Sequence, residues 1–326
     1  MELLFPLSQY WWMYAIFTGF VLVFLAVDLG VFHRHAHVVS FRESLIWSVI
    51  WVALALLFNY GVYLYTSSLH GPETGSRIAL EFLTGYIVER SLAIDNIFVF
   101  VLVFAYFGIP AQYQHRVLFF GIVGALVCRA GFIALGSLLM QYQAVALIFG
   151  VFLLVTGVKM IWTPDPKVEP DKNLLIRMFR RLAPVTPQLH GKNFLVRING
   201  RWHATPLLVT LLFVELSDIV FAVDSVPAIF AITREPLIVY TSNVFAILGL
   251  RAMYFLLAAA IERFHLLKYA LAFILIFVGL KMVWLNEAFG GKFPIEWSLG
   301  IIGTLLGGAI LVSWLLPSRE SLPHPR

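Results

Sequence analysis

Carboxylates inside apolar segments are the residues of this sequence whose types and spacing could do chemistry. Six of them lie in such segments: Asp28, Glu89, Asp95, Glu215, Asp218 and Asp224. Each charge at the centre of a bilayer costs about 2.5–3.5 kcal/mol on insertion scales. The deep arginines are Arg90, Arg129 and Arg251, and we expect Arg129, Arg251 and Asp28 to form supporting ion pairs. Three arginines neutralise at most three acids, so the surplus negative charge favours a cation or proton site over a purely structural set of pairs.

The oxygen atoms near these acids are hard ligands for a metal ion. Asn96 and Ser225 each follow an aspartate directly and add an amide and a hydroxyl oxygen. Such a set suits Mg²⁺, Ca²⁺ or Mn²⁺ rather than a soft metal, because no Cys or His lies nearby, and geometry does not choose among the three. Pro227 removes the hydrogen bond to the carbonyl of Val223. We therefore expect a helix break there that turns Asp224 inward and frees a carbonyl oxygen.

The elements that must position these residues are membrane helices. The chain has 326 residues, of which 60% are hydrophobic and 13% charged, whereas a soluble domain carries about 25% charged residues. The sequence therefore predicts an all-α polytopic membrane protein, because its apolar segments are too long and continuous for membrane strands. At about 20 apolar residues a span, we expect nine transmembrane helices: 10–32, 43–65, 78–107, 116–139, 142–162, 206–231, 236–261, 267–286 and 294–316.

Lysine and arginine residues gather in alternate loops, and this indicates the orientation of the chain. Eight of them lie in the longest loop, at 163–205, which we expect to be cytoplasmic. The N-terminus is then outside and the C-terminus cytoplasmic. Because these basic residues follow membrane topology, they imply contact with the lipid bilayer and not with a nucleic acid. The sequence does not identify protein partners. Within the loop, Asn199-Gly200 lies between two β-prone runs and predicts a small hairpin over 194–205.

An internal repeat relates the third to fifth predicted helices to the sixth to eighth. Three pairs of segments align in chain order: LAIDNIFV (92–99) with FAVDSVPA (221–228), LVCRAGF (126–132) with LGLRAMY (248–254), and VTGVKMIW (155–162) with FVGLKMVW (277–284). Each copy has three spans, an odd number, so the second copy is inverted, an arrangement that exposes one central site alternately to the two sides. The single membrane domain 1–326 then contains a first repeat at 78–162 and a second repeat at 206–286.

The repeat places the polar residues in pairs. These are Glu89 with Asp218, Asp95 with Asp224, Asn96 with Ser225, Arg129 with Arg251, and Lys159 with Lys281. Glu215 and Pro227 have no counterpart in the first copy, so we expect the helix at 206–231 to be the more distorted and to provide more of the ligands. Lys159 and Lys281 lie near span ends, where their side chains can extend to the interface, so we leave them out of the site.

Four segments closely resemble the TerC family of membrane proteins, in particular its Alx branch: ERSLAIDNIFVF, ELSDIVFAVDSVPAIF, SNVFAILGLRAMYF and KYALAFILIFVGLKM. The resemblance covers most of the chain, from the first predicted helix through the eighth. It implies a bacterial inner-membrane protein linked to manganese export and metal homeostasis, built on the three-helix inverted repeat of the LysE-like transporter superfamily. The family's motif residues map, without departure, to Glu89, Asp95, Asn96, Glu215, Asp218, Asp224 and Ser225.

The function we expect is proton-coupled export of Mn²⁺ by a secondary transporter, not an enzyme; Ca²⁺ and Mg²⁺ remain possible cargo. One alternative is a membrane protein that binds Mn²⁺ and delivers it to exported enzymes, and the sequence does not separate this role from export. A second alternative is an intramembrane aspartyl protease that uses Asp95 and Asp224. The GxGD pattern of that class is absent, and the other acids would be unexplained. No Walker loop is present, so ATP does not drive this chain.

Overall fold

The computed structural model of the chain describes residues 3–31, 40–139, 142–162, 184–258, 266–289 and 293–315. Within these ranges, some side chains lie outside the described residues, among them those of Asp28, Asp95 and Asp224. The long helices are α1 (Leu7–Val31), α2 (Phe41–His70), α3 (Pro72–Tyr106), α4 (Ala111–Leu139), α5 (Gln143–Trp162), α7 (Pro206–Phe230), α8 (Pro236–Leu248), α10 (Leu267–Leu280) and α12 (Ile295–Leu315). The shorter elements are β1 (Leu195–Ile198), β2 (Arg201–Ala204), α9 (Leu250–Ala258), the π-helix η3 (Lys281–Leu285) and α11 (Asn286–Ala288).

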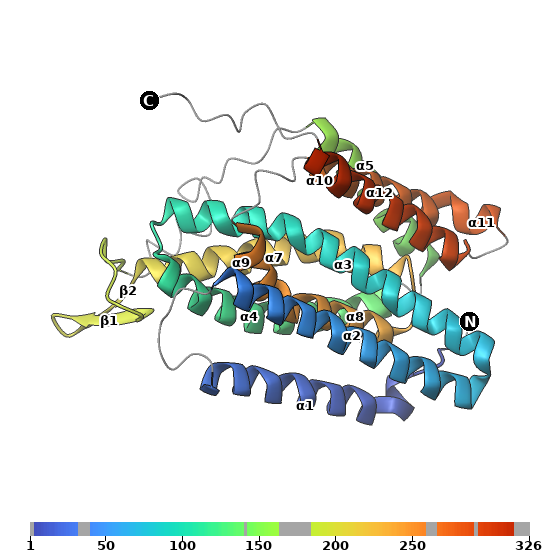
Figure 1. Ribbon diagram of the computed structural model, residues 1–326, viewed down its shortest axis with the longest axis horizontal. Helices are drawn as coiled ribbons and strands as arrows, with labels where there is room; N and C mark the ends of the chain where they lie inside the picture. Colours follow the sequence, from blue (N-terminus) through green and yellow to red (C-terminus); the bar gives the residue numbers. More distant parts are fainter. Residues whose placement is uncertain are drawn as a thin grey trace.

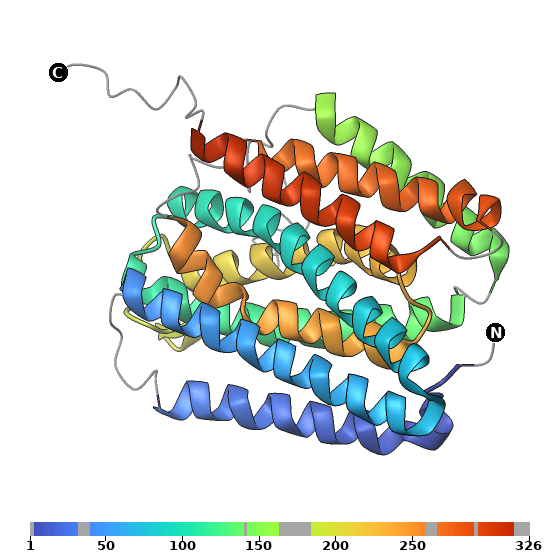
Figure 2. The same cartoon turned by 45° about the vertical axis from the view of Figure 1, so that its right-hand side comes forward.

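The helices run roughly along one direction and form a bundle with three parts (Figure 1). The centre consists of α3, α4, α7 and α8, in which α4 packs against α7 and α3 packs against both α7 and α8. Helices α1 and α2 lie along one side of this centre, and α5, α10 and α12 lie together along the other (Figure 2). Helices α3 and α7, which carry most of the candidate site residues, therefore belong to the centre of the bundle.

The prediction of an all-α polytopic membrane protein is confirmed. Six of the described helices are long and apolar enough to cross a membrane, or seven if the bent pair α8 and α9 forms one span. Helix α5 has a shorter apolar stretch, Leu147–Trp162, and α3 is not in this set. The count of nine spans therefore stays a prediction, although every predicted span coincides with a helix or a run of helices.

The ends of several elements follow from local chemistry. Prolines occupy the first turn of α3, α7 and α8, where the missing N–H has no helical partner to lose. The predicted hairpin is present: β1 and β2 are antiparallel, and Asn199 and Gly200 have φ of 50° and 80°, which suits a two-residue hairpin turn. The Thr205 hydroxyl donates to the Asn193 carbonyl oxygen at 2.8 Å, so the hairpin is attached to the start of α7 at one end of the bundle (Figure 1).

The predicted helix break at Pro227 is wrong, because α7 continues through this residue to Phe230. The proline lies in the last turn, so only one hydrogen bond is lost, and the Ala231 N–H still donates to the Pro227 carbonyl at 3.0 Å. The larger distortions lie elsewhere in the second predicted repeat. Helices α8 and α9 are bent by about 40° at Gly249, where a Cβ atom would collide with the guanidinium of Arg90.

The second distortion is the π-helix η3, which begins at Lys281 and continues α10. Lys281 is only 1% exposed, and its ammonium donates to the hydroxyl of Ser298 on α12 at 3.2 Å. The expectation that this lysine reaches the membrane interface is therefore wrong, whereas its repeat partner Lys159 is exposed. Lys281 differs from Lys159 in burial because α12 packs over α10. The position of a lysine within its own helix does not reveal which other helix packs over it.

The end of the bundle opposite the hairpin contains a buried carboxylate network. Glu235, just before α8, accepts hydrogen bonds from the backbone N–H groups of Leu4 at 2.8 Å and Phe5 at 3.2 Å. The hydroxyl of Thr233 donates to Glu81 of α3 at 2.5 Å and accepts from the Glu235 N–H at 3.2 Å. These contacts attach the N-terminal segment to the connection between α7 and α8.

Burial raises the pKa of the Glu235 carboxyl above its ordinary value of 4.5, and the nearby Glu81 adds to the shift. The backbone donors and Arg77 lower the pKa of this carboxyl, but burial outweighs them. A raised pKa means that the folded protein holds the proton more tightly than the unfolded chain. Glu235 therefore contributes stability that is fully present below pH 4.5 and is lost as the pH rises through the raised pKa.

We expect Glu235→Gln to remove this contribution to the pH dependence of unfolding. The glutamine still accepts a hydrogen bond but does not titrate, so the difference in stability between wild type and variant changes by at most about 1.4 kcal/mol per pH unit. Thermal unfolding of detergent-purified protein from pH 4 to pH 8 measures that difference. A constant difference across this range contradicts the assignment.

Candidate cation site

The guanidinium of Arg129 lies at the centre of the candidate site. Arg129 projects from α4 and is 2% exposed. It donates to both carboxylate oxygens of Asp218, from Nε at 3.4 Å and from Nη2 at 3.3 Å. It also forms an ion pair with Glu89 of α3. One guanidinium thus joins the two acids that the predicted repeat relates to each other.

Glu89 is the most enclosed member of this cluster, with none of its surface exposed. Neither of its carboxylate oxygens accepts a hydrogen bond from a residue that the structure describes. Among the described residues, the positive charge of Arg129 compensates the negative charge of Glu89. Removing one partner of such a buried pair leaves an uncompensated charge, which typically costs about 3–5 kcal/mol.

Two neutral oxygens complete the surroundings of the guanidinium. Nη1 of Arg129 donates to the Ser225 hydroxyl of α7 at 3.3 Å and to the amide oxygen of Asn243 of α8 at 3.2 Å. Both side chains are buried, Ser225 at 2% and Asn243 at 0% exposure. Asn96 is buried too, seven residues after Glu89 and on the same face of α3. The site is therefore lined by hard oxygen atoms from three helices around one cation.

Asn243 is the member of the site that sequence reasoning did not assign. A polar residue within an apolar span is most simply interpreted as a hydrogen bond between helices, and Asn243 does make such a bond. The partner is the site arginine, and the amide nitrogen of Asn243 has no hydrogen-bond partner among the described residues. Its position in an apolar run was the available signal, but the sequence does not show which helix it faces.

Glu215 lies beside the cluster and is half-buried. Three residues before Asp218, it occupies the same face of α7 on the side of the hairpin. Its carboxylate lies against Gly124 of α4, where any side chain would occupy the same space. Gly124 therefore provides the room for this acid between two closely packed helices.

The structure brings together only part of the predicted set. Glu89, Asp218 and Ser225 meet at Arg129, which forms ion pairs with the two acids and donates a hydrogen bond to the serine. Arg251 is half-buried on α9. The side chains of Asp28, Asp95 and Asp224 lie outside the described residues, so their places in the site stay predictions.

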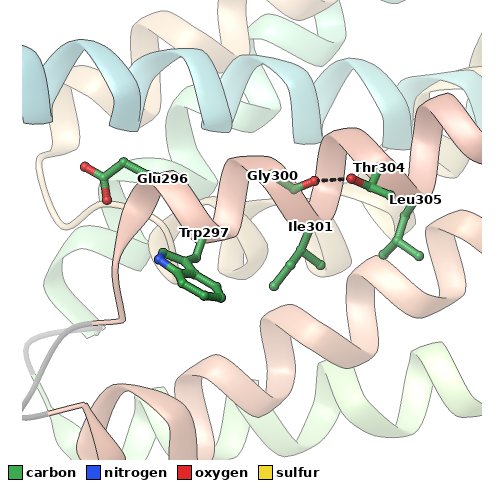
Figure 3. A pocket seen from close by; sticks show the side chains of 6 residues that line it. All are labelled: Glu296, Trp297, Gly300, Ile301, Thr304 and Leu305. Atoms are coloured by element: carbon green, nitrogen blue, oxygen red, sulfur yellow. Dashed lines mark hydrogen bonds between the residues drawn. The ribbon is translucent and has the colours of Figure 1, made fainter.

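No group of three or more His, Cys, Asp or Glu side chains that could hold a metal ion occurs among the residues that the structure describes. A hollow of about 520 Å³ lies on α12, lined by Glu296, Trp297, Gly300, Ile301, Thr304 and Leu305 (Figure 3). All six residues come from one helix, and Glu296 is the only carboxylate among them. This hollow therefore does not have the oxygen ligands of a cation site, unlike the cluster around Arg129.

Comparison with known proteins identifies close relatives. The model of the "Integral membrane protein TerC family" matches residues 74–321. A Myxococcus xanthus protein named "Uncharacterized membrane protein STKORF319" is 50% identical over 310 residues, which cover 95% of this chain and 93% of that protein. The Escherichia coli K12 protein named "Putative membrane-bound redox modulator Alx" is 46% identical over 302 residues, which cover 92% of this chain and 93% of that protein. No solved structure matches the chain.

We expect Glu89→Gln to destabilise the protein by about 3 kcal/mol, because the substitution breaks a buried ion pair. The exposed Glu296 of α12 provides a matched control, and Glu296→Gln should change the stability by less than about 0.5 kcal/mol. Denaturant unfolding of the two variants in detergent measures both effects. Equal stabilities would show that the Glu89–Arg129 pair does not hold the centre of the bundle together.

Proposed function

Because the chain belongs to the TerC family of integral membrane proteins, we propose that it is a secondary transporter that exports Mn²⁺ from the cytoplasm in exchange for protons. The cargo binds at the centre of the bundle, where Glu89 and Asp218 supply carboxylate oxygens and Ser225 a hydroxyl oxygen. The further predicted ligands are Asp95, Asn96, Glu215 and Asp224. No residue of this set is assigned a catalytic role.

The observation that carries this proposal is the meeting of Glu89 and Asp218 at one point. They come from helices at equivalent positions of the two predicted repeats, and each is at most 4% exposed. Two buried acids surround one guanidinium here, so this cluster of described side chains carries a surplus negative charge when both acids are ionised. The excess negative charge supports a site for a second cation, and an inverted repeat supports its alternating exposure to the two sides.

The contacts between the helices support the same mechanism. In the predicted repeats, α3 corresponds to α7, α4 to α8 with α9, and α5 to α10. The pair α4–α7 is then the counterpart of the pair α3–α8, and both pairs are in contact, as are α5 and α10. Reciprocal packing of this kind allows one set of helices to rock against the other around a central site.

The choice of Mn²⁺ rests on ligand chemistry and on the family resemblance together. Carboxylate, hydroxyl and amide oxygens suit Mg²⁺ and Ca²⁺ as well, and the resemblance to proteins linked to manganese export favours Mn²⁺. Among the relatives, the name of the Escherichia coli protein refers to redox modulation. This chain has a single cysteine, Cys128, so it cannot cycle a dithiol within the chain.

We place the protein in the bacterial inner membrane with the N-terminus outside. The basic loop that contains the hairpin is then cytoplasmic, and α7 runs from the cytoplasm outward. Glu215 precedes Asp218 on this helix, so it lies on the cytoplasmic side of the site. Because an exported ion enters from that side, Glu215 is the first of the three acids of α7 to meet it.

Transport into inverted membrane vesicles tests export directly. We expect Mn²⁺ uptake above that of vesicles without the protein, and we expect Asp218→Asn to abolish it, because the variant removes one of the two carboxylates that pair with Arg129. Binding without flux in the wild type would instead favour the alternative of metal delivery. Cleavage of a membrane substrate that is lost with Asp224→Asn would favour the protease alternative.

A second variant tests the route past Glu215. Gly124→Ala places a methyl group where the Glu215 carboxylate lies, so we expect Mn²⁺ flux to fall severalfold. Gly131 lies on the same helix with nothing within 4 Å of an added Cβ, and Gly131→Ala should leave the flux unchanged. Equal fluxes in the two variants would remove Glu215 from the route.

A further inference from the structure

We propose that the guanidinium of Arg129 is a resident counter-cation, which occupies the cation site when no metal is bound and withdraws when the metal binds. This inference rests on the proposed function, because it specifies how the empty site of the transporter is neutralised. It assigns Arg129 a positioning role in the transport cycle, beyond that of a structural ion-pair partner.

The first argument is that Arg129 contacts the oxygens that the cargo needs. Its nitrogens lie within 3.2–3.4 Å of oxygens from Asp218, Ser225 and Asn243, and it pairs with Glu89. A hard divalent cation binds oxygen at about 2.0–2.6 Å. These oxygens cannot surround a metal ion while a guanidinium lies among them, so metal and guanidinium compete for one place.

The second argument is the charge of the site. Glu89 and Asp218 carry two negative charges when ionised, and Arg129 carries one positive charge. With the guanidinium in place these three groups sum to −1, and a divalent ion brings two positive charges to the same two acids. Two buried acids with neither cation would leave a charge of −2 inside the membrane, which is strongly unfavourable. Arg129 therefore allows the empty site to reorient.

The third argument is that the hydrogen bonds of Arg129 to Asp218, Ser225 and Asn243 are long and leave a buried group of the site unsatisfied. Its four hydrogen bonds measure 3.2–3.4 Å, longer than the 2.9–3.0 Å that is most common for N–H donors to oxygen. The amide nitrogen of Asn243 has no hydrogen-bond partner among the described residues. A pair with a purely structural role would be expected to satisfy this buried group.

Binding of Mn²⁺ to the purified protein, measured by electron paramagnetic resonance of the free ion, tests the competition. We expect Arg129→Gln to bind Mn²⁺ about tenfold more tightly than the wild type, because the competing cation is gone. Arg129→Lys keeps the charge without the forked donors, so its affinity should lie between the two. The control is Arg116→Gln on the same helix, where Arg116 stacks on Phe120 and Phe194 outside the site, and its affinity should match the wild type.

Vesicle assays add a readout that a structural role would not produce. Arg129→Gln should lose net Mn²⁺ export, which requires return of the empty site, while Mn²⁺–Mn²⁺ exchange persists, because exchange never passes through that state. Unchanged or weaker Mn²⁺ affinity in Arg129→Gln overturns the inference about Arg129 but does not contradict the proposed export function. If Arg129→Gln does not fold, the affinity of Arg129→Lys decides by the same criterion. A wild type that neither binds nor transports Mn²⁺ overturns the proposed function, and the inference with it.

Discussion

Charge neutralisation in a medium of low dielectric constant is the constraint on which the rest of this structure depends. Two charges about 4 Å apart interact by about 4 kcal/mol at an effective dielectric constant of 20, far more than in water. The fully buried Glu89 and the nearly buried Asp218 are stable only where Arg129 reaches both. Helices α3, α4 and α7 must therefore meet at one level, and Asn243 adds α8 to the same point.

The outer helices follow from this centre, because a charged cluster tolerates no contact with lipid. Helices α1 and α2 cover one side, and α5, α10 and α12 cover the other (Figure 2). The covering helices are themselves held together by close approach. A Cβ atom at Gly279 of α10 would lie 2.7 Å from the Gly150 carbonyl oxygen of α5, so small residues allow their backbones to touch.

The sequence predicted those features whose cause is local or internal to one helix. Asn199-Gly200 specifies its hairpin turn without help from the rest of the chain, and the apolar runs identify the helices. The predicted repeat relates Glu89 to Asp218, and the structure places both acids at Arg129. By contrast, the burial of Lys281 depends on Ser298 of α12, a neighbour that periodicity cannot identify. The expected break at Pro227 is absent because a proline in the last turn of a helix removes only one backbone hydrogen bond.

The arginines show where the symmetry of the predicted repeat must end. Arg129 and Arg251 are equivalent in the sequence, yet two guanidinium groups cannot share the point between Glu89 and Asp218, because their charges repel and their atoms would overlap. Arg129 occupies that point, and Arg251 lies on α9 just beyond the bend at Gly249. The bend belongs to the second predicted copy, while α4 continues unbroken through Arg129. The two predicted halves therefore differ both at the second helix, where the bend lies, and at the third, where η3 begins and Lys281 is buried.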